Sequence, residues 1–471
     1  MEDLQEAITC LRQALALLPG GHHNRSDSLN NLGNAVFTRF EQLGRMKELE
    51  EAITCYRQAL ALRPYGHPNH SDSLNNLGNA VLTRFEQSGR MDSEDLEEAI
   101  RLYRRALALR PHGHPNRSDS LNNLGNAVST RFHQLVKMED LEEAIACHRQ
   151  ALALLPHDHP NRSGSLDSLG SAISDLFQQL GRKEDLEEAI THYRQALALR
   201  PHGHPNRSDS LNKLGIAVST RFQQLRRMED LEEAITRLRQ ALALLPRRPH
   251  NCSDFLSNLG NALLERFKQS RRMEDLEEAI TCHRQALALR PHSHPNLSDS
   301  LYNIGNVVST RFRRLRRMED LEEAITCYRQ ALALRPHNPT NLESLGVAVL
   351  TRFKQSGRMK DLEMAIRLYR RALTLRPHGH PNRSDSLNKL GTAVSTRFEQ
   401  LGGMEDLDEA IACRRQALAL LPHSHPNLSD SLNYLGSAVF TRFEQLGRME
   451  DLEEAITCHR HSLALDRKSV V

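Results

Sequence analysis

Residues 183–227 read KEDLEEAITHYRQALALRPHGHPNRSDSLNKLGIAVSTRFQQLRR, and this 45-residue unit recurs along almost the whole chain. Its register follows from one isoleucine in each copy. Eight of the ten steps between these isoleucines are 45 residues long, and the other two are 47 and 41. A fixed period of this length predicts a stack of repeats that bury their apolar faces on one another. The isoleucines are Ile8, Ile53, Ile100, Ile145, Ile190, Ile235, Ile280, Ile325, Ile366, Ile411 and Ile456.

Each unit contains two amphipathic segments separated by polar breaks. In residues 48–62 the apolar side chains recur every three or four residues, which is the spacing of one helix face. They are Leu49, Ala52, Ile53, Tyr56, Ala59, Leu60 and Leu62. The second segment has a stripe of the same kind, formed by Leu29, Leu32, Val36 and Phe40. The two patterns predict eleven helices of the first kind, ten of the second, and an all-α chain.

The residues around these segments predict where the helices start and stop. The Asp-x-x-Glu run at residues 185–188 has the spacing of a capping box, and Ser26 or Asp27 is expected to cap the second helix. Pro64 is expected to end the helix before it, because proline disfavours helical backbone in the preceding residue. Gly33 recurs in every unit, and its missing Cβ predicts a close approach of two helix backbones.

The composition argues against several classes of partner. The 62 basic and 59 acidic residues nearly cancel to a formal charge of +3, so no net field favours nucleic acid or an acidic membrane. The densest basic cluster, residues 311–317, is expected to be a solvated helix end, because few aromatic residues accompany it. No run approaches the roughly 18 apolar residues of a membrane span, and the acidic start is unlike a signal peptide. A cytoplasmic location, with no nucleic-acid or membrane partner, is predicted.

The order of the two segments resembles the tetratricopeptide repeat. Leu32-Gly33 is followed by Ala52, then by Ala59, then by Pro64, with the alanine and proline spacings of that family. The resemblance implies hairpins of a helix A, which contains Leu-Asn-Asn-Leu-Gly, and a helix B, which contains Glu-Ala-Ile. Such hairpins stack into a right-handed superhelix. The stretch between the glycine and the first alanine is about two helical turns longer here than in the usual repeat.

Two longer forms of this repeat are similar to the chain. Residues 67–78, which run from His-Pro-Asn to Leu-Gly, resemble repeats of the kinesin-light-chain type. The Arg-Phe-Glu-Gln run before Glu-Asp-Leu-Glu-Glu-Ala-Ile is more similar to fungal arrays. Those arrays are often linked to a caspase-like CHAT domain or to a nucleotide-binding domain.

We therefore predict one tetratricopeptide solenoid over residues 1–471, with no separate catalytic domain. It consists of ten hairpins that follow a lone helix B at residues 1–19. Neither end carries the polar capping helix of a finished solenoid, so we expect the array to be the arm of a longer protein. The oligomeric state is left open.

Histidine and cysteine recur with the repeat, but neither predicts a metal site. Each loop offers only two imidazoles, whereas a metal site needs further ligands, so we expect solvated loops. Protonation of the 24 histidines would nevertheless make the chain sensitive to acid. Seven of the eight cysteines follow the register isoleucine by two residues, and such positions are too far apart for disulfides. The paired histidines are His112 and His114, His157 and His159, His202 and His204, His292 and His294, His378 and His380, and His423 and His425.

The candidate binding residues are asparagines of helix A. The resemblance places helix A on the concave face of the superhelix, and positions three before and one after the glycine project the same way. An amide donates and accepts at once, so a row of amides is suited to the backbone of an extended peptide. Asp167, Tyr302 and Glu343 are among the residues that interrupt the row. The row consists of Asn30, Asn34, Asn75, Asn79, Asn122, Asn126, Asn212, Asn261, Asn306, Asn388 and Asn433.

These features predict a scaffold that binds proteins or extended peptides and is not an enzyme. No Gly-rich phosphate loop, Ser-His-Asp set or Cys-His nucleophile is recognisable, and no cofactor is expected. By resemblance, the chain would be the sensor or interaction arm of a larger fungal signalling protein. Two alternatives remain open. One is a fragment of a CHAT-type protease, and the other is a cargo adaptor like kinesin light chain.

Overall fold

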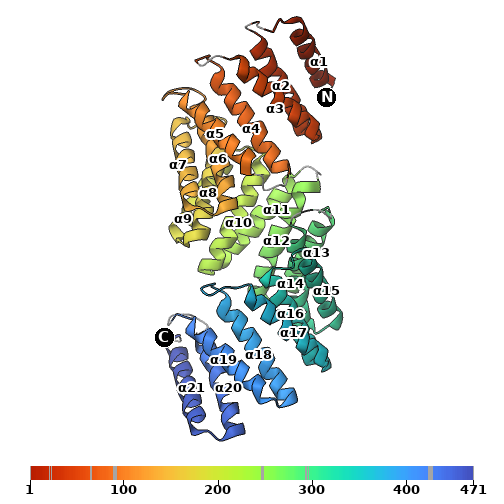
Figure 1. Ribbon diagram of the computed structural model, residues 1–471, viewed down its shortest axis with the longest axis vertical. Helices are drawn as coiled ribbons and strands as arrows, with labels where there is room; N and C mark the ends of the chain where they lie inside the picture. Colours follow the sequence, from red (N-terminus) through yellow and green to blue (C-terminus); the bar gives the residue numbers. More distant parts are fainter. Residues whose placement is uncertain are drawn as a thin grey trace. The chain divides into compact units, whose positions relative to one another are not determined.

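The structure is a computed structural model that describes residues 2–20, 22, 24–63, 66–88, 93–245, 249–291, 294, 296–422 and 428–469. Over these ranges the chain forms 21 α-helices and no strand, which confirms the predicted all-α solenoid (Figure 1). The helices group into two compact units, residues 1–245 and 246–471. The expectations for Met1, Pro64, His292, His423 and His425 concern residues outside the described ranges.

In the first unit, helices A and B alternate along the chain. Its helices B are α1 (Glu2–Leu17), α3 (Met46–Leu62), α5 (Ser93–Ala108), α7 (Met138–Leu154), α9 (Lys183–Ala198) and α11 (Met228–Leu244). Its helices A are α2 (Arg25–Leu43), α4 (His70–Ser88), α6 (Arg117–Leu135), α8 (Arg162–Leu180) and α10 (Arg207–Leu225).

The second unit repeats this alternation and begins with a helix A. Its helices A are α12 (Pro249–Ser270), α14 (Leu297–Leu315), α16 (Pro339–Ser356), α18 (Arg383–Leu401) and α20 (Leu428–Leu446). Its helices B are α13 (Met273–Ala288), α15 (Met318–Leu334), α17 (Met359–Thr374), α19 (Met404–Ala419) and α21 (Met449–Ser469).

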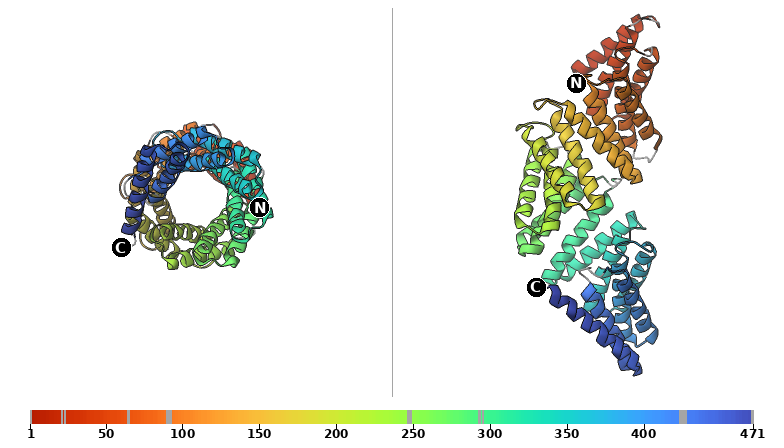
Figure 2. Two further views of the ribbon diagram at one scale, coloured as in Figure 1. Left: turned by 90° about the horizontal axis from the view of Figure 1, so that it is seen from below. Right: turned by 90° about the vertical axis from the view of Figure 1, so that its left-hand side faces the viewer.

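Within each unit, a helix B lies between two helices A, except for α1, α11 and α21 at the ends of the units. It packs most extensively on the helix A before it, and it also packs on the helix A after it (Figure 2). The register isoleucines explain this order, because they are buried wherever a following helix A is present. Ile100 and Ile325 are fully buried, whereas Ile456 on α21 is 43% exposed. The repeat therefore builds a continuous core from neighbouring hairpins.

Helix A ends at a residue in the left-handed conformation. In the first hairpin this residue is Gly44, with φ of 66°, and its N–H donates to the Phe40 carbonyl at 2.7 Å. In the described chain, four residues with side chains occupy this corner, and a left-handed L residue costs about 1–2 kcal/mol. Those residues are Val136, Arg226, Arg271 and Arg316.

We expect Val136→Gly to stabilise the chain by about 1 kcal/mol. Val136 has φ of 53° and is β-branched, whereas glycine adopts this conformation without strain. The gain is the relieved strain less the extra entropy that glycine loses on folding. Urea unfolding of the variant beside the parent chain measures it. A lower urea midpoint for the glycine variant would contradict the claim that Val136 is strained.

The predicted capping box at residues 185–188 is wrong. Helix α9 starts at Lys183, so Asp185 lies inside the first turn, and Arg182 at the N-cap makes no side-chain cap bond. In other hairpins the equivalent aspartate pairs with an arginine of the preceding helix A, as Asp140 does with Arg131 at 2.7 Å. The aspartate therefore joins the two helices of a hairpin.

The predicted caps of helix A are wrong as well. Helix α2 starts at Arg25, and the side chain of Asn24 before it makes no cap bond. Ser26 is buried inside the first turn, and Asp27 pairs with the Arg63 guanidinium at 2.5 Å. Both residues therefore serve contacts between helices and leave the N-terminus of their own helix uncapped.

In most hairpins the recurrent glycine lies directly against a side chain of helix B. A Cβ at Gly33 would lie 2.6 Å from the Tyr56 ring of helix B. The same position meets Tyr103 at Gly78 and His148 at Gly125. At Gly215 and Gly391 a backbone carbonyl of helix B also lies 3.3 and 3.4 Å from the Cβ position, which agrees with the predicted close approach of the two helices.

Candidate functional site

The first unit carries a polar groove along its helices A. Its volume is about 800 Å³, and it is lined by residues of α2, α4, α6 and α8 and of the loops after α5, α7 and α9. The first six asparagines of the predicted row, which lie between Asn30 and Asn126, all line it. The structure therefore brings these six residues together. Apart from Pro160 and Gly164, every residue that lines the groove has a polar side chain.

The asparagines three before the glycine are largely used for stacking the hairpins. The Asn30 amide accepts from the Ser73 hydroxyl at 3.1 Å. The Asn75 amide and the Ser120 hydroxyl share a bond of 3.0 Å, and the Asn122 amide donates to Ser165 at 2.6 Å. Each bond joins one helix A to the next. These residues therefore fix the spacing of the groove more than they offer free groups to a ligand.

The asparagines one residue after the glycine are oriented by hydrogen bonds to their side-chain oxygens. The Tyr56 hydroxyl donates to Asn34 Oδ1 at 2.9 Å, and Asn76 Nδ2 donates to the same oxygen at 3.2 Å. One hairpin later, Tyr103 donates to Asn79 Oδ1 at 2.8 Å, and Asn123 Nδ2 does so at 3.1 Å. With both lone pairs of the oxygen engaged, the Nδ2 groups of Asn34 and Asn79 remain as donors.

At two positions the asparagine row is interrupted by a carboxylate that forms a buried ion pair. Asp167 is 5% exposed and bonds the Arg200 guanidinium. Glu343 is also 5% exposed and bonds Arg376 at 2.5 Å and Lys389 at 2.6 Å. Charged side chains are almost never buried unless they are paired. These two residues hold successive hairpins together.

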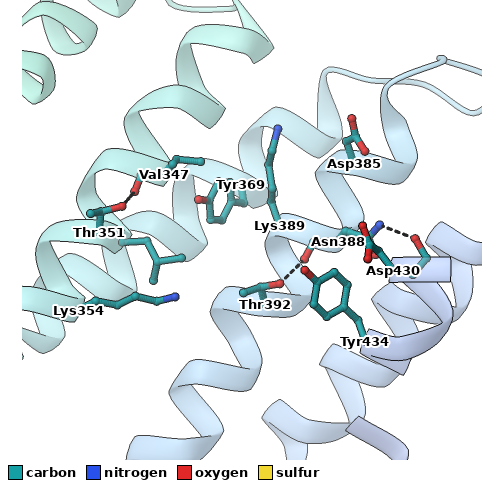
Figure 3. Close-up of a pocket in the computed structure, with 12 residues that line it drawn as sticks. Val347, Thr351, Lys354, Tyr369, Asp385, Asn388, Lys389, Thr392, Asp430 and Tyr434 are labelled. Atoms are coloured by element: carbon teal, nitrogen blue, oxygen red, sulfur yellow. Dashed lines mark hydrogen bonds between the residues drawn. The ribbon is translucent and has the colours of Figure 1, made fainter. Parts of the chain in front are cut away.

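The second unit has a pocket of different chemistry between α16, α17, α18 and α20 (Figure 3). Its volume is about 490 Å³. Val347 and Thr392 stand where the groove of the first unit has asparagine, and Tyr434 adds an aromatic ring. Val347 offers no acceptor to Tyr369, whose hydroxyl points toward α16 in Figure 3. The mixture of apolar and charged groups suits a side chain better than a peptide backbone.

The other predicted asparagines are dispersed. Asn388 lines the pocket of the second unit and donates to Ser431 at 3.2 Å. Asn306 lines a smaller cavity and accepts from the Tyr328 hydroxyl at 2.8 Å. Asn261 and Asn433 are exposed, and Asn212 is half-buried. The structure places none of these five in the groove of the first unit.

Sequence reasoning missed two groups that form the groove. Asn76 and Asn123, two residues before the glycine, line it and orient the predicted row. The Asn-Asn doublet in Leu-Asn-Asn-Leu-Gly was a signal for them. The tyrosines of helix B had no such signal, because their spacing identified them only as part of the apolar face.

The second histidine of each described His-x-His pair has a structural role. The Nδ1 atom of His114 accepts from the Asn116 N–H at 3.1 Å, and His159 and His204 make the same bond two residues ahead. In the ranges that the structure describes, no three His, Cys, Asp or Glu side chains form a cluster that would hold a metal. Burial raises the pKa of the Cys147 thiol to about 11.

Comparison with known repeat families agrees with this geometry. One tetratricopeptide-repeat family matches residues 37–114, and a second matches residues 117–161 and 254–296. A third family, described as "TPR repeat", matches residues 313–351. A Sel1-repeat family matches residues 171–200 and 346–375. The chain is an array of tetratricopeptide repeats.

Among solved structures, the chain is similar to a human protein. The structure titled "Human IFIT1 dimer with PPP-AAAA" matches with a TM-score of 0.52 and 15% identity, over 98% of this chain and 94% of that one. The structure titled "Human IFIT1 dimer with m7Gppp-AAAA" matches with a TM-score of 0.52, 14% identity and coverage of 98% and 95%. At this identity the likeness shows the fold alone. No curated protein matches the chain.

Among the described helices, none has the length and apolar character needed to span a membrane.

Proposed function

We propose that the chain is a protein-binding scaffold whose first unit holds an extended peptide in its asparagine-lined groove. The observation that carries this proposal is the fixed orientation of Asn34 and Asn79. Tyrosine hydroxyls and neighbouring amides occupy the oxygens of both residues, so each presents Nδ2 as a donor. Carbonyl groups of a peptide backbone are the matching acceptors.

The spacing of the hairpins supports the same ligand. Successive helices A are on the order of 10 Å apart, and three residues of extended peptide span about the same distance. One donor per hairpin would thus meet one carbonyl in every three residues. The groove has almost no apolar lining. Recognition would rest on the backbone, and the peptide sequence would contribute little.

We expect the triple variant Asn34→Ala, Asn79→Ala and Asn126→Ala to lose at least about tenfold in peptide affinity, because each substitution removes a donor. Peptides are first selected from a displayed library of random linear sequences, and their affinities are then measured by fluorescence anisotropy. The matched control is Asn261→Ala with Asn306→Ala in the second unit. Asn306 also loses a tyrosine bond there. Unchanged affinity in the triple variant, or an equal loss in the control, would contradict the proposal.

The proposed setting is the interaction arm of a larger fungal signalling protein in the cytoplasm, with no chemistry of its own. The resemblance of the Arg-Phe-Glu-Gln and Glu-Glu-Ala-Ile runs to fungal arrays supports it. Two alternatives remain: part of a CHAT-type caspase-like protease, and a cargo adaptor like kinesin light chain. Sequencing of the full transcript distinguishes the three. A caspase-like segment favours the protease, and a heptad coiled coil favours the adaptor.

The proposal includes no nucleic-acid partner for the groove. No Phe, Tyr or Trp side chain lines the groove for base stacking, and its two lining arginines, Arg110 and Arg200, are already paired with Asp72 and Asp167.

A further inference from the structure

We infer that the corner where α1, α2 and α3 meet is a binding site for a phosphate group. A pocket of about 380 Å³ lies at this corner. Its lining includes four cationic side chains, Arg12, Arg39, Arg45 and Lys47, and only two carboxylates. The pocket lies outside the asparagine groove, which is lined by other residues. The site is therefore independent of the proposed function.

The same corner in later hairpins shows how unusual this charge is. In six of them the arginine equivalent to Arg39 bonds an aspartate of its own hairpin at 2.6–2.7 Å and a carboxylate of the preceding helix B at 2.8–3.2 Å. Arg131, with Asp140 and Glu97, is one example. In these six hairpins the arginine is thus neutralised from both sides.

Three substitutions weaken that neutralisation in the first hairpin. Gln5 occupies the position of Glu97, and in all ten later copies this position is Glu or Asp. Lys47 occupies a position that is Glu in every other copy except one. Glu48 replaces an aspartate that all the other copies share. With the usual residues, the corner would hold three cations and four carboxylates.

The contacts of Arg39 show the result. Its Nε lies 3.8 Å from Glu48, its Nη2 lies 3.7 Å from Glu51, and its Nη1 donates to the neutral Gln5 amide at 2.9 Å. Arg39 Nε is buried and has no hydrogen-bond partner. Arg45 and Lys47 have no carboxylate within 4 Å in the described chain.

A phosphate group is the ligand that this arrangement fits. Guanidinium groups bind its oxygens through paired N–H donors, and the lysine adds a compact charge. The first turn of α3, where Lys47 lies, has no side-chain cap, so its N–H groups and the helix dipole also favour an anion. The group has two possible sources, a free phosphate or pyrophosphate ion and a phosphorylated peptide. Both offer the same oxygens.

Calorimetric titration with pyrophosphate tests the site at constant ionic strength, with sodium chloride as the reference. A phosphoserine peptide and its unphosphorylated form make up the second arm. We expect the parent chain to bind pyrophosphate, and we expect Gln5→Glu with Lys47→Glu to weaken that binding by at least about tenfold. Lys360→Glu is the matched control, because Lys360 is the other lysine at this position and Arg352 beside it keeps its two carboxylates.

The outcomes are distinct. Tighter binding of the phosphoserine peptide than of pyrophosphate identifies a protein source, and the reverse identifies a free ion. No binding by the parent chain overturns the proposal, as does equal binding by the charge-restored variant. The Asn34, Asn79 and Asn126 triple variant should bind pyrophosphate like the parent chain. A failure of the peptide groove would therefore not be mistaken for a failure of this site.

Discussion

Arg200→Leu should destabilise the first unit by about 3–5 kcal/mol, the usual cost of removing one partner from a buried ion pair. Arg200 is 3% exposed and bonds Asp167, which is 5% exposed. It also donates to the Asn206 carbonyl at 3.0 Å and to the Ser163 hydroxyl at 3.3 Å. Leucine would leave the Asp167 carboxylate buried without its cation, and α8, α9 and α10 would lose their common contact. The shift of the urea midpoint, followed by circular dichroism, measures the cost.

A neighbouring hairpin suggests a second substitution that should restore the stability of this variant. One hairpin earlier, Asn122 and Leu155 occupy the positions of Asp167 and Arg200, and both are well accommodated there. Arg200→Leu combined with Asp167→Asn copies that pair, so we expect it to recover at least half of the lost stability. If the double variant were as unstable as the single one, the buried charge would not be the cause of the loss.

Acid should destabilise the fold through two buried histidines. His148 and His283 are each 1% exposed and occupy the slot over the glycine that tyrosine fills in other hairpins. The pKa of each imidazole is lowered from 6.5 to about 4, mainly by burial and to a smaller extent by Lys213 near His148 and Arg290 near His283. The unfolded chain therefore takes up these protons first. Stability is complete above about pH 6.5 and falls as the pH drops toward 4.

The expected loss is about 2 kcal/mol per histidine between pH 7 and pH 5, from a shift of this size. His148→Tyr with His283→Tyr removes both groups and restores the tyrosine of the sister hairpins. Asn126 and Asn261 stand at the positions that accept from tyrosine elsewhere, so the new hydroxyls have acceptors available. We expect the urea midpoint of the tyrosine variant to fall much less at pH 5. An equal fall in both chains would rule out the histidines as the acid-sensitive groups.

Much of the fold could be predicted because its determinants are local and repeated. The apolar spacing around Ile53 and around Leu32 identified both helices of the hairpin, and the period identified the stacking. The errors at Ser26, Asp27 and Asp185 share one cause. A polar residue before an apolar stripe was interpreted as a cap. Asp27 instead pairs with Arg63, 36 residues away, and Asp140, the equivalent of Asp185, pairs with Arg131, 9 residues away.

The candidate groove was predicted in part. Six asparagines of the predicted row line one groove in the first unit, because residues at one position of a repeat face the same way. The local pattern could not predict whether the amide oxygen or the amide nitrogen faces the groove. Residues of neighbouring helices decide this, namely Tyr56, Tyr103, Asn76 and Asn123. No long-range signal marked the buried ion pairs in the sequence. Arginine stands 33 residues after Asp167 and after Glu343, but Arg63 also stands 33 residues after Asn30.

The sequence by itself determined the all-α class, the helix register and the row of amides, because each follows from residue spacing within one unit. The tertiary structure alone decided how those residues are used. It turned the asparagine oxygens toward tyrosines, buried two charged residues of the row in ion pairs, and left the first corner with excess positive charge. The physical reason is that hydrogen bonds and ion pairs depend on groups from the next hairpin, about 40 residues away in the sequence and only one helix away in space.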